Sequence, residues 1–104
     1  MPTKKHMLEE IKSIVEPIAK KYGVERVYLF GSYARGDATD NSDVDLRVDK
    51  GALKGVFALS GLYTEIQETL QTKVDLLTTG SLNDEFLRKI QKEEVLLYEK
   101  QSRC

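Results

Sequence analysis

The spacing of the apolar residues changes several times along the chain, and these changes restrict the folds that it can adopt. Residues 4–22 place apolar side chains every three or four positions, which predicts an amphipathic helix that ends near Gly23. Pro17 lies inside this pattern and removes one backbone hydrogen bond, so we expect a kink or a break there. Residues 26–30 form a compact run of β-branched and aromatic residues, residues 44–48 form a second run bounded by polar residues, and both predict strands.

The second half of the chain continues this alternation. We expect a helix over residues 53–71, a strand over residues 73–78, a third helix from a capping box at Ser81 and Asp84 to about residue 92, and a strand over residues 95–98. A short helical turn is also expected at residues 32–35. The predicted order is α-β-α(short)-β-α-β-α-β. It indicates an α+β fold, close to α/β, in which about three helices cover a mixed sheet of about four strands.

The composition indicates an ordinary globular protein. With 104 residues, 40% hydrophobic and 32% charged, the chain can build one modest core, and we expect a single domain over residues 1–104. The net charge is -1, with 16 basic and 17 acidic residues, so no strong field of one sign favours binding to nucleic acid or to a membrane. Because we find no long apolar run and no leader pattern, we expect a cytoplasmic protein.

Two acidic residues in the second predicted strand are the densest chemical signal. Asp43 and Asp45 are two positions apart, so their side chains should project on one face while Val44 and Leu46 anchor the other face in the core. Two neighbouring carboxylates repel each other unless a cation lies between them, and such oxygen ligands suit Mg²⁺ or Mn²⁺. A pair of this kind is also common on solvated strands, so alone it is weak support for a metal site.

A glycine and a serine end the first predicted strand. Gly31 permits close approach of the backbone to a ligand, and the helical turn that follows offers unpaired N–H groups to a phosphate, to which Ser32 could add a hydroxyl. The same backbone would also form if Gly31 only terminated the strand and Ser32 only capped a helix. The combination with the two acids is what points to a nucleotide site.

The combined motif resembles a known family. Gly31-Ser32, ten residues, and then Asp43-x-Asp45, with Ala34-Arg35-Gly36 inside and Ser42 before the pair, is similar to the minimal (MNT-type) nucleotidyltransferases of the DNA polymerase β-like superfamily. The resemblance covers nearly the whole chain. It implies an enzyme that transfers a nucleoside monophosphate, in particular AMP from ATP, to a hydroxyl. Many members are antitoxins encoded beside a HEPN-domain RNase toxin, and the resemblance implies that some silence the toxin by AMPylation of a tyrosine.

The family pattern also implies a third carboxylate on a neighbouring strand, and Asp75 is the position that fits. An acid inside the apolar run of residues 73–78 is costly unless it is paired or bound to a metal, which is a physical reason independent of the resemblance. The alternative is that Asp75 lies on an edge strand and faces water. In the implied mechanism Asp43 and Asp45 bridge two Mg²⁺ ions, and Asp75 completes the site and could accept the proton of the attacking hydroxyl.

Two arginines and several alternatives stay open at this point. We assign Arg35 to the nucleotide together with Gly31 and Ser32, although it could instead only balance the charge of the acids when nucleotide is absent. Arg47, which should share the face of the acids, could bind phosphate, balance the acids, or be an exposed residue without a role. One alternative function is a non-catalytic antitoxin that masks the toxin, and another is an adenylyltransferase that acts on a small molecule. Two exposed sheet edges would also allow homo- or hetero-oligomers.

Overall fold

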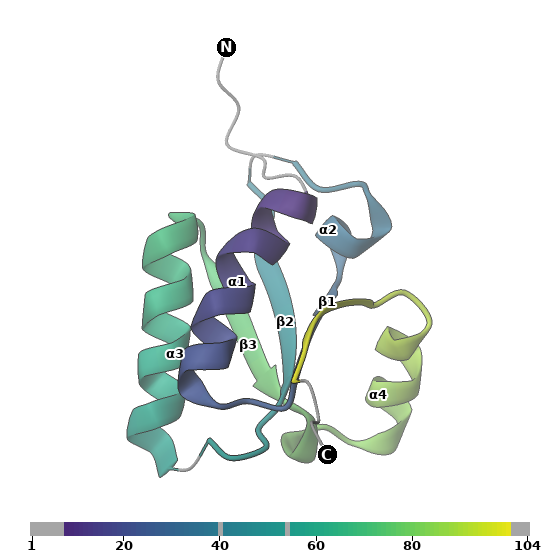
Figure 1. Cartoon of the computed structure of the whole chain (residues 1–104). Coiled ribbons are helices and arrows are strands. Elements are labelled where there is room, and N and C mark those ends of the chain that lie inside the picture. The colour runs from purple at the N-terminus through teal and green to yellow at the C-terminus, as the bar shows by residue number, and fades with distance from the viewer. Residues whose placement is uncertain (1–7, 40, 54, 101–104) are drawn as a thin grey trace.

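The computed structural model describes residues 8–39, 41–53 and 55–100, which form four strands and four α-helices. In chain order the elements are α1 (Leu8–Tyr22), β1 (Arg26–Phe30), α2 (Ser32–Arg35), β2 (Val44–Asp49), α3 (Gly55–Leu70), β3 (Val74–Thr78), the 3-10 turn η1 (Thr79–Ser81), α4 (Asp84–Gln91) and β4 (Val95–Glu99) (Figure 1). This is the order that the sequence predicts, with η1 added. No helix among these elements has the length and apolar character needed to cross a bilayer.

The four strands form one mixed sheet in the order β3-β2-β1-β4. Strand β1 runs antiparallel to both of its neighbours, while β2 and β3 are parallel and are joined by the crossover helix α3. Both β3 and β4 are edge strands of this sheet, as expected. The connection through α3 determines which residues of β2 and β3 become neighbours.

The two faces of the sheet have different partners. Leu29 and Leu46 are paired in the sheet, are fully buried and belong to one core cluster with residues of α1 and α3. Because side chains alternate along a strand, the neighbouring Phe30 points to the opposite face, where the ring of Phe86 from α4 meets it edge-on at 6.3 Å between centroids. Figure 1 shows α1 and α3 together on one side of the strands and α4 on the other. The face that carries Asp45 is therefore the α4 side, because Asp45 pairs with Phe30.

Helix α1 differs from its prediction in one respect. It runs without interruption from Leu8 to Tyr22 with Pro17 inside it, which excludes a break into two pieces; a kink, the other outcome expected at Pro17, stays a prediction. The helix ends as expected at Gly23, which has a φ of +78° and donates its N–H to the carbonyl of Ala19 at 3.1 Å. The predicted start at residue 4 lies outside the described residues.

The start of α4 also differs from its prediction. The expected capping box at Ser81 and Asp84 does not form, because Ser81 belongs to η1 and its hydroxyl donates to the carbonyl of Thr78 at 2.8 Å. Asn83 is the N-cap instead, and its side-chain oxygen accepts the N–H of Phe86 at 2.7 Å. The helix thus begins two residues later than expected, and its Phe86 packs against Phe30.

Candidate active site

The paired acids lie where β2 enters the sheet. Val44 and Leu46 are fully buried on the side of α1 and α3, and Asp45 between them is half-buried on the opposite face. Asp43, just before the strand, is also half-buried. The predicted alternation of acids and core residues along this strand is confirmed.

Asp75 is the neighbour of Asp45 on the adjacent strand. The parallel register of β2 and β3 pairs the two residues directly, so two elements that are distant in sequence bring these acids together. The expectation that Asp75 is an acid confined in an apolar interior is wrong, because β3 is an edge strand and Asp75 is exposed. Its position beside Asp45 comes from sheet register and not from burial.

The electrostatics of this site favour a cation. Burial, and after it the negative charges of Asp75 and Asp43, raise the pKa of Asp45 to about 6, from an ordinary value of 3.8. Within the described part of the chain no three His, Cys, Asp or Glu side chains already enclose a metal position. The acids are neighbours with unfavourable mutual charge, and their oxygens are the donors that Mg²⁺ prefers.

Gly31 brings the turn after β1 against Asp45. Its φ of +80° and ψ of -154° are tolerated only by glycine. A Cβ atom at this position would collide with the Asp45 carboxylate, whose carbon would be 3.1 Å away. The glycine therefore allows the backbone of the turn and the carboxylate to pack in direct contact, as expected for a site in which both face one ligand.

Glu93, which the sequence analysis did not single out, binds this same turn. Its Oε2 accepts the N–H of Gly31 at 2.9 Å, and both of its carboxylate oxygens lie 3.2 Å from Nη1 of Arg35. Arg35 also donates from Nε to Asp37 at 3.3 Å. The Gly31 N–H itself is thus paired with a carboxylate.

Glu93 gave no signal in the sequence because it lies with Glu94 at the end of a charged helix, where solvated acids are common. A nucleotide role for Gly31, Ser32 and Arg35 stays a prediction.

A cleft of about 320 Å³ opens at the turn. Its lining contains the predicted nucleotide residues and one acid of the pair, and consists of Phe30, Gly31, Ser32, Arg35, Asp45, Phe86, Lys89, Ile90 and Glu93. A larger hollow of about 640 Å³ lies elsewhere, between α1 and the end of β4, and none of the candidate site residues lines it. The smaller cleft is the better candidate because it combines a carboxylate, a cationic side chain and a glycine turn.

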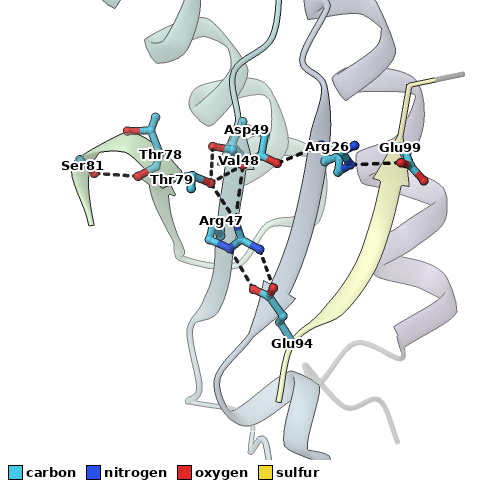
Figure 2. Close-up of polar contacts among 9 residues, drawn as sticks. All are labelled: Arg26, Arg47, Val48, Asp49, Thr78, Thr79, Ser81, Glu94 and Glu99. Atoms are coloured by element: carbon cyan, nitrogen blue, oxygen red, sulfur yellow. Dashed lines mark hydrogen bonds and ion pairs between the residues drawn. The ribbon is translucent and has the colours of Figure 1, made fainter. Parts of the chain in front are cut away.

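Arg47 is paired with Glu94, an acid outside the group that the sequence analysis considered. It is only 4% exposed, and its guanidinium forms two hydrogen bonds with Glu94, at 2.9 and 2.5 Å (Figure 2). Nη1 donates to the hydroxyl of Thr79 at 2.9 Å, and the guanidinium stacks 4.0 Å from the ring centre of Tyr28. Arg47 is therefore not an exposed residue, and its guanidinium is engaged by these neighbours. It fastens the junction of α4 and β4 to the strand that carries Asp45.

A mixed sheet with adjacent carboxylates beside a glycine turn and a small polar cleft is the arrangement of a nucleotidyltransferase. The model of the family "Polymerase beta, Nucleotidyltransferase" matches residues 9–103, and the chain belongs to this family. The Methanocaldococcus jannaschii protein MJ0435 is 39% identical over 88 residues, which cover 85% of this chain and 95% of the relative. Protein adenylyltransferase MntA of Thermococcus cleftensis is 33% identical over 92 residues, which cover 85% of this chain and 93% of the relative. Both relatives are named as protein adenylyltransferases, and this chain is accordingly an enzyme of the nucleotidyltransferase family.

Solved structures are similar over most of the chain. A toxin–antitoxin structure with AMP-PNP contains a chain that is 26% identical, with a TM-score of 0.72 and coverage of 90% of this chain and 76% of the other. A chain in the complex of a tri-AMPylated Shewanella oneidensis HEPN toxin with an MNT antitoxin is 19% identical, with a TM-score of 0.69 and coverage of 90% and 74%. The second likeness shows a shared fold.

Proposed function

We propose that this protein transfers AMP from ATP, in the presence of Mg²⁺, to a tyrosine hydroxyl of a HEPN-domain toxin and thereby acts as its antitoxin. Three similarities support the proposal. A relative over nearly the whole chain is a protein adenylyltransferase, a structural neighbour is a toxin–antitoxin structure with an ATP analogue, and another neighbour is a complex with an AMPylated HEPN toxin.

The observation that carries the proposal is the meeting of Asp45, Asp75 and the Gly31 turn. The register places the two carboxylates side by side, and Gly31 packs directly on Asp45. A triphosphate held along the turn would therefore present its α-phosphorus to the acids. Acids that serve only solubility are normally well separated and solvated. Here one acid is half-buried beside two others, which raises its pKa to about 6 and is typical of a functional site.

The residues present fit magnesium. Asp43, Asp45 and Asp75 would be its ligands, because three carboxylates supply hard oxygen donors and a cation would offset both the burial and the repulsion that raise the pKa of Asp45. When bound, the metal would make the acceptor hydroxyl more acidic and would neutralise charge on the phosphates. Mn²⁺ has the same preference for oxygen and could replace it.

The protein residues would divide the remaining work. Ser32 and Arg35 would hold the β- and γ-phosphates, with Gly31 leaving room for their approach to the turn, and this would orient the bond between the α-phosphorus and its bridging oxygen away from the acceptor. The tyrosine oxygen then forms a bond to the α-phosphorus, the bridging bond breaks, and pyrophosphate leaves. The exposed carboxylate of Asp75 would receive the proton of the hydroxyl.

The intact mass of a HEPN-domain toxin, the class of acceptor that we propose, tests the proposal. The toxin is incubated with the protein, Mg²⁺ and each NTP in turn, and the double variant Asp43→Ala/Asp45→Ala is the control. The expected result is a mass gain of one or more AMP units with ATP, located on a tyrosine by peptide fragmentation, and no gain with the control. A stable complex without any mass gain would instead indicate that the protein masks the toxin.

A further inference from the structure

One side chain outside the acid pair ties together two parts of the candidate nucleotide cleft. The carboxylate of Glu93 accepts the Gly31 N–H and pairs with Arg35 at the same time, and Glu93 is itself part of the cleft lining. Arg35 is held a second time by Asp37 through Nε. Among the described residues Nη2 of Arg35 forms no hydrogen bond, so it could donate to an anion in the cleft.

The Gly31 contact is important because the Gly31 peptide has a conformation that only glycine tolerates. A charged acceptor on its N–H fixes the direction of that peptide, and this peptide packs on the carboxylate of Asp45. Glu93 thus sets the spacing between the turn and the acid.

Glu93 is itself firmly placed by its neighbour in sequence. Glu94 forms two hydrogen bonds with the buried Arg47 of β2, the same strand that carries Asp45. The segment between α4 and β4 is therefore fastened to β2 on one side, and from there Glu93 reaches the turn after β1. These contacts connect β2, the segment before β4 and the turn after β1, and such mutual support keeps a binding site rigid.

We propose that Glu93 is a positioning residue of the nucleotide site, which holds the Gly31 peptide and the Arg35 guanidinium in the orientation that receives the triphosphate. The inference rests on the proposed function only in that the nucleotide binds in this cleft. The alternative is that the Glu93 carboxylate competes with the triphosphate for Gly31 and Arg35. The two possibilities differ in sign, because a positioning residue strengthens nucleotide binding and a competitor weakens it.

The experiment is a calorimetric titration of the whole protein with AMP-PNP and Mg²⁺. Glu93→Gln keeps an acceptor for the Gly31 N–H but loses the charge that faces Arg35, and Glu93→Ala loses both. We expect Kd to rise about 10-fold or more in Glu93→Ala, the scale of a charge-assisted hydrogen bond, with a smaller rise in Glu93→Gln. Glu68→Gln, on the exposed surface of α3, removes the same charge at a distance and should leave Kd unchanged.

A double-mutant cycle tests whether Glu93 acts through Arg35. Glu93→Ala raises Kd by a certain factor in the wild type. In an Arg35→Ala background, we expect the same substitution to raise Kd by a factor about threefold smaller, or less still. A residue that only stabilised the fold would lower the melting temperature and leave this coupling at zero. In the transferase assay, the same variants should raise KM for ATP more than they lower kcat.

Three results would overturn the inference. Tighter AMP-PNP binding in both Glu93 variants would identify a competitor, an unchanged Kd with lower stability would identify a purely structural residue, and a cycle without coupling would exclude action through Arg35. If Glu93→Ala does not fold, the nearly isosteric Glu93→Gln decides the sign. Failure of the wild type to bind any NTP would instead contradict the proposed function itself.

Discussion

Asp45 on β2 and Asp75 on β3 are direct neighbours in the parallel register of the sheet. The strands meet this way because the crossover through α3 returns the chain beside β2. Burial and the charge of Asp75 then raise the pKa of Asp45. Without a cation, the mutual repulsion of the two carboxylates destabilises the folded protein. With a bound cation, the pair would place positive charge next to the phosphoryl group that reacts.

Removal of either carboxylate should abolish transfer and spare the fold. We predict that Asp45→Asn and Asp75→Asn each lower the rate of AMP transfer by more than about 100-fold, because even loss of a residue that only supports a metal ligand costs about 10- to 100-fold. The rate is measured by intact mass of the toxin over time, and circular dichroism checks the fold. Full activity of Asp75→Asn would remove Asp75 from the site.

The raised pKa of Asp45 predicts a pH dependence of stability in metal-free protein. The folded state holds the Asp45 proton more tightly than the unfolded state, so this group contributes stability that is full below about pH 3.8 and is lost as pH rises through about 6. Asp45→Asn is neutral at every pH. It should therefore be more stable than the wild type near pH 7, and the difference should shrink toward about pH 4.

Urea unfolding in EDTA across this pH range measures both proteins. Added Mg²⁺ should stabilise the wild type and not Asp45→Asn, because ligand binding to the folded state raises its stability. Parallel pH profiles of the two proteins would show that Asp45 titrates as an ordinary carboxyl.

Gly31 and Gly36 allow a matched comparison, since both have positive φ, of +80° and +87°. A Cβ at Gly31 would collide with Asp45, while one at Gly36 meets no atom within 4 Å. We expect Gly31→Ala to lose about 1–3 kcal/mol of stability and most of its activity, because the turn must move away from the acid. Gly36→Ala should cost about 1 kcal/mol through backbone strain and keep its activity. Equal activities in the two variants would contradict a role for the close packing of Gly31.

The local features of the site could be predicted from the sequence because they depend on neighbours along the chain. The bounds of β1 and α2 agree with those expected, since Gly31 ends one element and permits the next. Asp45 faces outward because Val44 and Leu46 on either side of it need the core. Helix α4 was placed too early because both Ser81 and Asn83 can cap a helix, and only the formation of η1 removes Ser81.

The roles of Arg47 and Glu93 could not be predicted because each depends on a partner far away in sequence. Arg47 bonds to Glu94, which is 47 positions later, and Glu93 bonds to Gly31, which is 62 positions earlier. The alternation of side chains along β2 correctly predicted that Arg47 lies on the same face of the sheet as Asp45. It cannot show whether other residues cover that face at Arg47. Asp75 illustrates the same limit, since its burial was expected wrongly while its pairing with Asp45 depends on register.

Removal of one partner of the buried pair of Arg47 and Glu94 should destabilise the protein more than replacement of both. Each side chain is almost inaccessible, with 5% and 8% of its surface exposed. Arg47→Ala leaves a buried carboxylate without its main partner, and we expect a loss of about 3–5 kcal/mol in the free energy of unfolding. Replacing both residues, as Arg47→Met with Glu94→Leu, should recover most of that loss, because apolar side chains of similar size avoid the desolvation of two charges. Urea unfolding of the two variants and the wild type measures this. A double variant no more stable than Arg47→Ala would mean that the bonds of Arg47 to Thr79 and its stacking on Tyr28 contribute more than the ion pair.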